Sequence, residues 1–123
     1  MTNLDRAKTI YSMMAEGKML EAFDTYYHDD AIKVEGNGDV LKGKAANRET
    51  QVQWVESTEE VHGSGVTAMA EDSENGTVLI ETWVDVTFKG GSRIKIEQVA
   101  VQKWENGLIV HERFYYNPSA MGM

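Results

Sequence analysis

Three consecutive stretches near the C-terminus decide the fold: Thr77–Phe88 (TVLIETWVDVTF), Arg93–Trp104 (RIKIEQVAVQKW) and Leu108–Tyr116 (LIVHERFYY). In each of them apolar and polar residues tend to alternate, and β-branched and aromatic residues are frequent, which predicts β-strands. The stretches are separated by Gly90-Gly91 and by Glu105-Asn106-Gly107, which are typical of hairpin turns. The sequence therefore predicts a three-stranded antiparallel meander from Thr77 to Asn117.

The chain before this meander is mainly helical in its patterning. Apolar residues at helical spacing predict three helices, from about Leu4 to Met14 with Thr2 or Asn3 as N-cap, from about Lys18 to Tyr27, and from Lys44 to about Glu60. Ala31–Glu35 and Val61–Glu71 predict two further strands, and Gly63 and Gly65 mark a bulge or sharp bend in the second. Helices followed by an antiparallel sheet predict an α+β fold, in a single domain over residues 1–123 with the helices on one face of the sheet.

Composition excludes several classes of partner and chemistry. The 123 residues are 41% hydrophobic and 26% charged, as in an ordinary globular protein, and the net charge of -8 disfavours nucleic acid and anionic membranes. The absence of cysteine excludes disulfides, thiolate metal sites and a cysteine nucleophile. No cofactor fingerprint or metal-ligand spacing occurs, so neither a cofactor nor a metal is expected. The mixed N-terminal pattern does not resemble a signal peptide, and no apolar run is long enough to span a membrane, so we expect a cytoplasmic protein.

Several local strings resemble a known superfamily. YYHDDAIKVEGNG (26–38), LKGKAANRE (41–49) and WENGLIVHERFYYN (104–117) are similar to the entry segment and last hairpin of the nuclear-transport-factor-2-like superfamily. That superfamily includes ketosteroid isomerases, SnoaL-like polyketide cyclases and limonene epoxide hydrolases. The resemblance implies a cystatin-like cone, in which a strongly curved sheet encloses the N-terminal helices and a small-molecule pocket, and a homodimer formed through the outer sheet face.

The register of the two hairpins predicts which side chains share the pocket, because side chains on a strand alternate between faces. A two-residue Gly90-Gly91 turn places Trp83 opposite Gln98, and a three-residue loop at 105–107 places Ala100 opposite Glu112. The pocket face then collects Leu79, Glu81, Trp83, Asp85, Ile94, Ile96, Gln98, Ala100, Gln102, Val110, Glu112, Phe114 and Tyr116. The opposite face, with Lys95, Glu97, Lys103, His111 and Arg113 among aliphatic residues, suits a dimer interface.

Two carboxylates on the predicted pocket face are the candidate catalytic groups. A carboxyl group among apolar side chains has its pKa raised and can act as an acid or base near neutral pH, which favours Glu112 and Asp85. The alternative is that one or both lie at a wet strand end or pair with Arg48. The expected ligand-binding residues are Trp83, Gln98, Gln102, Phe114 and Tyr116.

The resemblance assigns positions to the catalytic groups of the relatives. For ketosteroid isomerases, it places Gly36 at the proton shuttle, Ile10 beside Tyr11 at the helix tyrosine, and Ala100 at the strand aspartate. All three roles are therefore vacant, and this activity is not expected.

For limonene epoxide hydrolases, the resemblance places Asp85 at the acid, Trp83 at the arginine and Phe114 at the second aspartate. SnoaL-like cyclases require only a carboxylate base and a donor for an enolate, which Glu112 or Asp85 with Gln98 or Gln102 would provide. The sequence thus predicts a SnoaL-like protein with a pocket for a small apolar organic molecule and acid–base chemistry of the isomerase, cyclase or hydrolase type. The alternative is a non-catalytic ligand-binding or dimerisation module.

Overall fold

The structure is a computed structural model and describes residues 1–121. Its helices are α1 (Asn3–Ala15), α2 (Met19–Tyr26) and α3 (Lys44–Ser57), with short 3-10 turns η1 (Ser73–Asn75) and η2 (Pro118–Met121). Its strands are β1 (Tyr27–Val34), β2 (Val40–Lys42), β3 (Thr58–Asp72), β4 (Thr77–Phe88), β5 (Arg93–Glu105) and β6 (Leu108–Tyr115). The predicted α+β class and the Thr77–Asn117 meander are confirmed.

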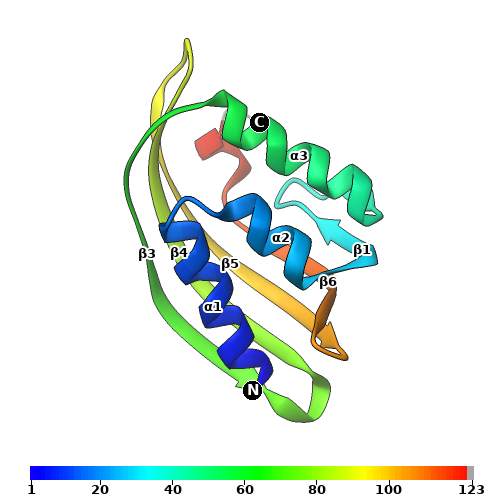
Figure 1. Cartoon of the computed structure of the whole chain (residues 1–123). Helices are drawn as coiled ribbons and strands as arrows, with labels where there is room; N and C mark the ends of the chain where they lie inside the picture. The colour runs from blue at the N-terminus through cyan, green and yellow to red at the C-terminus, as the bar shows by residue number, and fades with distance from the viewer. Residues whose placement is uncertain (122–123) are drawn as a thin grey trace.

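All six strands form one sheet with the order β2-β1-β6-β5-β4-β3. Every neighbouring pair is antiparallel except β1 and β6, which run parallel. Figure 1 shows that the sheet is strongly curved and that the three helices lie on its concave side, as the cystatin-like cone requires. The parallel pairing brings the beginning of the sheet beside its last strand, which places β1 side chains next to those of β6.

The boundaries of several elements differ from the sequence prediction. β1 begins at Tyr27 rather than Ala31, α3 ends at Ser57 rather than near Glu60, and the short strand β2 was not predicted. The predicted irregularity of β3 is confirmed, because its pairing with β4 shifts register between Val61 and Gly63.

The core lies between the concave face and the first two helices. Thr2 caps α1 through a capping box with Asp5, which satisfies amide groups at the helix start. The buried core cluster consists of Ala7, Ile10, Ala22, Val78, Ile80, Ala100, Trp104 and Ile109. The even-numbered positions of β4 and β5 therefore face the helices.

The face predicted for β4 is wrong, because the observed register of the β4–β5 hairpin differs from the predicted one by one residue. The β4–β5 hairpin has a three-residue loop at 89–91, so Ile80 lies opposite Ala100, Trp83 opposite Glu97 and Asp85 opposite Lys95. Because the side-chain period of a strand is two, this single residue moves the odd-numbered side chains of β4 to the outer face. Leu79, Glu81, Trp83 and Asp85 are thus excluded from the concave face.

The β5–β6 hairpin also differs from the prediction, yet the predicted face of β6 holds. Asn106 and Gly107 form a two-residue turn with positive φ values of 51° and 79°, instead of a three-residue loop. Trp104 pairs with Ile109 and Lys103 pairs with His111, so one extra residue, Val110, forms a bulge in β6. The bulge shifts the register so that Glu112 lies opposite Gln102 on the concave face.

Candidate functional site

A buried carboxylate, Glu112, is the centre of the polar groups on the concave face. Its side chain is 2% exposed, although it carries a carboxyl group. The hydroxyl of Tyr27 donates a hydrogen bond to Oε1, and Nε2 of Gln102 donates to Oε2 at 2.8 Å. Gln102 is fixed in turn, because its Oε1 accepts from Nε1 of Trp104 at 3.2 Å. A buried carboxylate is stable only with such partners, so these contacts hold Glu112 in one orientation.

Two tyrosines approach Glu112 from the N-terminal part of the chain. Tyr27, at the start of β1, stacks on Phe23 of α2 with ring centroids 4.3 Å apart. Tyr11 projects from α1. Burial, and next the charge of Glu112, raise the pKa of both phenols above the ordinary value of 10.0. Both side chains therefore keep their O–H groups at neutral pH and remain hydrogen-bond donors.

Lys33 of β1 lies beside Glu112 in the sheet, because the two residues are partners in the parallel β1–β6 pairing. Its side chain is buried, with 3% of the residue exposed, and its ammonium lies 5.2 Å from the ring centroid of Phe114. Lys33 was not among the predicted catalytic or ligand-binding residues. The alternation in residues 31–35 placed Ala31 and Lys33 on a common face, but nothing local indicated that this face meets Glu112.

A second polar contact lies at the end of the same face. The hydroxyl of Tyr116 donates to Oε2 of Glu35 at 3.1 Å, and burial together with Glu35 raises the pKa of this phenol. A Cβ built on Gly36 would lie 2.8 Å from the Tyr116 ring. The position that the family resemblance assigns to the proton shuttle is therefore covered by an aromatic ring.

Gln98, Gln102 and Phe114 lie on the same face as Glu112, as the sequence predicted. Gln102 lies opposite Glu112, Phe114 lies opposite Ala100, and the buried residues Ile96 and Ala100 flank Gln98. Their role in ligand binding stays a prediction.

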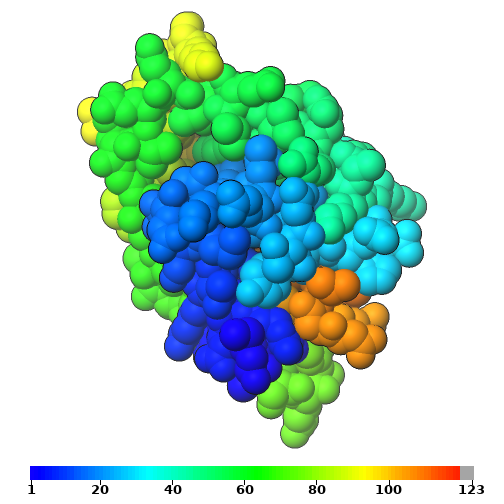
Figure 2. Space-filling view, viewed as in Figure 1, coloured from blue at the N-terminus to red at the C-terminus, as the bar shows by residue number. Residues whose placement is uncertain are grey.

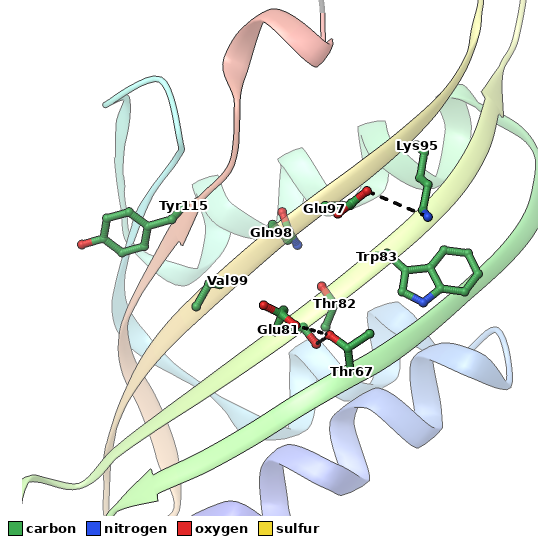
Figure 3. Close-up of a pocket in the computed structure, with 9 residues that line it drawn as sticks. All are labelled: Thr67, Glu81, Thr82, Trp83, Lys95, Glu97, Gln98, Val99 and Tyr115. Carbon is green, nitrogen blue, oxygen red and sulfur yellow. Dashed lines mark hydrogen bonds and ion pairs between the residues drawn. The ribbon is translucent and has the colours of Figure 1, made fainter.

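Trp83 and Asp85 were predicted to share this face, and the structure contradicts that placement. Trp83 lies on the outer face, where its ring covers the glycines of β3. A Cβ on Gly63 or Gly65 would approach that ring to 3.0 Å or 2.8 Å. Lys95 lies 5.1 Å from the same ring centroid, as Figure 3 shows from the outer side.

Asp85 also has a structural partner on that outer face. Its two carboxylate oxygens accept hydrogen bonds from Arg93 at 3.0 Å each. The guanidinium lowers the pKa of Asp85, which is opposite to the raised pKa that the sequence predicted. An ionised, paired carboxylate outside the cone is unsuited to the catalytic role expected of it.

Two hollows occur on the surface of the protein. One, of about 440 Å³, lies on the outer sheet face between Trp83, Glu97 and Tyr115 (Figure 3). The other, of about 720 Å³, lies beside Trp54 of α3 and Lys89. Figure 2 also shows a recess between the N-terminal helices, α3 and β3, on the side from which the helices are seen.

Within residues 1–121, no group of three or more histidine, aspartate or glutamate side chains is arranged to hold a metal ion. None of the helices in that range is long and apolar enough to cross a membrane. What the concave face does offer is a fixed carboxylate, protonated phenols and an ammonium group.

Comparison with known proteins places the chain in a family. The model of the SnoaL-like domain matches residues 1–116. A crystal structure from Mesorhizobium loti, described as a SnoaL-like polyketide cyclase, is 31% identical with a TM-score of 0.81, covering 94% of this chain and 100% of that one. No curated protein matches the chain.

More distant structures share the fold. A nuclear-transport-factor-2-like protein of unknown function from Burkholderia pseudomallei has a TM-score of 0.81 at 16% identity, covering 98% of this chain and 95% of that one. A cystatin-fold protein from Novosphingobium aromaticivorans has a TM-score of 0.76 at 22% identity, with coverages of 93% and 97%. These two show the fold alone. Because the family model spans nearly all of the chain, the protein belongs to the SnoaL-like domain family.

Proposed function

We propose that the protein binds a small, largely apolar organic molecule inside the cone and carries out acid–base chemistry on it, with Glu112 as the proton-transferring group. The observation that carries this proposal is the 2% exposure of Glu112 together with its orientation by Tyr27 and Gln102. A carboxylate that is held in a fixed orientation can accept a proton from a bound molecule and return it. The 31% identical Mesorhizobium loti protein is described both as a SnoaL-like polyketide cyclase and as a carbohydrate phosphatase, and the first of these descriptions agrees with this chemistry.

The proposed reaction is proton removal from a carbon next to a carbonyl group. Glu112 takes the proton, the electron pair of the C–H bond moves into an enolate, and the enolate oxygen accepts a hydrogen bond from a phenol. Tyr11 is the proposed donor, because its hydroxyl makes no hydrogen bond within residues 1–121, and its O–H is retained. Glu112 then returns the proton to a different atom of the same molecule. The product is therefore an isomer of the substrate, and no atom is gained or lost.

The test is hydrogen–deuterium exchange at the activated carbon of a 1,3-dicarbonyl probe, followed by NMR in D₂O. We expect the protein to accelerate the exchange and Glu112→Gln to lower the rate by about 10²- to 10⁴-fold. Glu97→Gln is the matched control, because Glu97 is an exposed carboxylate of β5 on the outer face. Full exchange activity in Glu112→Gln would refute the role of Glu112, and binding without exchange would favour the non-catalytic alternative.

We also infer that two copies of the chain pack through the outer sheet face. This face carries exposed apolar side chains, with Leu79 40% and Tyr115 52% exposed, beside the partly covered Val99 and Val101. Charges of both signs surround them, including Lys95 and Glu97, whose charged groups are 3.9 Å apart. Exposed apolar residues within a mixed-charge border are typical of protein interfaces.

A further inference from the structure

The ammonium group of Lys33 is a cation without an acceptor. Only 3% of the residue is exposed, and its Nζ lies 5.2 Å from the ring centroid of Phe114. Within the described chain, residues 1–121, Lys33 forms no hydrogen bond and no ion pair. An ammonium group has three donors, and none of them has an acceptor among the described residues, so water or a ligand must supply the acceptors.

The neighbouring carboxylates do not supply the missing acceptor. Glu112 is held by Tyr27 and Gln102. Glu35, two residues after Lys33, is held by Tyr116. Both carboxylates have donors, whereas the lysine has no acceptor, so the group missing from this face is an acceptor with negative charge.

The ammonium group of Lys33 is accessible to water, although the residue as a whole is buried. Among the described residues, Oδ1 of Asn47 is the one side-chain polar atom that is both sealed from water and without a hydrogen bond. Nζ of Lys33 has no hydrogen bond either, but it is not one of these sealed atoms. Part of its surface is therefore accessible to water. The ammonium therefore borders a space that a ligand atom could occupy.

We propose that Lys33 binds a carboxylate group of the ligand, so that the substrate is a carbonyl compound that also bears a carboxylate. Glu112 is the sheet partner of Lys33, so a molecule held by the ammonium presents its neighbouring carbon atoms to Glu112. The ring of Phe114 provides an apolar surface for the body of the molecule. This inference rests on the proposed function, because it names the substrate class of the same site.

A carboxylate fits this position better than a phosphate. Phosphate sites in proteins generally use an arginine fork, several cations or the amide groups of a helix N-terminus. Here one ammonium lies over an aromatic ring, and within residues 1–121 no other cation lies over that ring. A singly charged group with an attached apolar body matches one cation beside one ring.

The test compares two ligands of the same shape, phenylacetate and phenylacetamide, by calorimetry and by NMR shifts of the protein amides. We expect the protein to bind phenylacetate at least about tenfold more tightly than phenylacetamide, since the carboxylate gains a charge-assisted hydrogen bond. Lys33→Met should remove this preference, so that the variant binds phenylacetate no more tightly than phenylacetamide. Inorganic phosphate should bind more weakly than phenylacetate.

Lys95→Met is the matched control. Lys95 also lies over an aromatic ring, that of Trp83 at 5.1 Å, but its side chain is 56% exposed and on the outer face. We expect this variant to keep the preference for phenylacetate. Lys33→Met should also fold and melt at the same or a higher temperature, because it replaces an unpaired buried cation with an apolar chain of similar length.

Equal binding of the two ligands by the wild-type protein would overturn this inference. An unchanged preference in Lys33→Met, or phosphate binding as tight as that of phenylacetate, would also overturn it. If neither ligand binds but the dicarbonyl probe still exchanges through Glu112, the inference fails and the proposed function stands. If neither ligand binds and no exchange occurs, both fail.

Discussion

Tyr11 and Tyr27 show how one buried carboxylate changes its neighbours. Both phenols lie in the interior close to Glu112, and ionising either would place a second negative charge beside the first. Burial and this charge raise the pKa of each phenol above 10.0. The folded state therefore holds two protons that the unfolded state releases near its ordinary phenol pKa.

Because the pKa values of both phenols are higher in the folded state than in the unfolded state, we expect the protein to unfold at alkaline pH. A raised pKa in the folded state gives a stabilisation that is complete below pH 10 and is lost as the pH rises above that value. We expect Tyr11 and Tyr27 to ionise only together with unfolding, in a titration that follows phenolate absorbance and circular dichroism in parallel.

Two variants check the assignment. Tyr11→Phe and Tyr27→Phe should each reduce the absorbance change of the unfolding step, because each removes one buried phenol. If every tyrosine titrated near pH 10 with the fold intact, the burial of these phenols would be contradicted.

At the scale of elements, α3 is attached to the sheet mainly through polar contacts. Asn47 is its one buried residue, and Nδ2 donates to the carbonyl oxygens of Ala31, Leu41 and Gly43 at 3.1, 3.2 and 2.8 Å. At the other end, Trp54 contacts Phe88 edge to face, with ring centroids 5.3 Å apart. Ala45 and Val55, two of the apolar residues of this helix, are exposed.

Asn47→Ala should therefore loosen α3. Loss of the donor leaves carbonyl groups near β1 and β2 without this partner, and we expect a loss of about 1–3 kcal/mol in the free energy of unfolding. Amides of α3 should exchange hydrogen faster than those of β4 and β5. Asn47→Asp should cost more, because a carboxylate oxygen would face the carbonyl oxygens.

Gln53→Ala is the control for this change, since Gln53 is an exposed residue of the same helix. It should alter the stability by less than about 0.5 kcal/mol. Equal stability of Asn47→Ala and the wild-type protein would show that α3 is held by other contacts.

At the scale of the whole molecule, the proposed dimer depends on the outer face of the six-stranded sheet. A stable interface of this kind buries roughly 800 Å² of surface on each copy. Leu79 lies on the outer side of β4 opposite Val101 and is 40% exposed. A charge at this position would enter the interface unpaired.

We expect the wild-type protein to sediment as a dimer and Leu79→Asp to sediment as a folded monomer in analytical ultracentrifugation. Val55→Asp is the matched control, because Val55 is 44% exposed but lies on α3. A monomeric wild-type protein at high concentration, or a dimer that Leu79→Asp does not weaken, would contradict the proposed interface.

The sequence by itself determined the class of the fold, the three strands of the meander and the face of β5 and β6 that carries Gln98, Gln102, Glu112 and Phe114. The class and the strands follow from local periodicity and turn residues, whereas the predicted face of β6 holds because the Val110 bulge offsets the shorter turn. The face of β4 did not follow, because one residue in the loop at 89–91 inverts a pattern whose period is two.

Only the tertiary structure decided the composition of the site. Tyr27 and Glu112 are 85 residues apart in the sequence, and Lys33 meets Glu112 only through the parallel pairing of β1 with β6. Such long-range pairing leaves no local signal in a single sequence, because periodicity fixes which face a side chain takes but not which strand lies beside it.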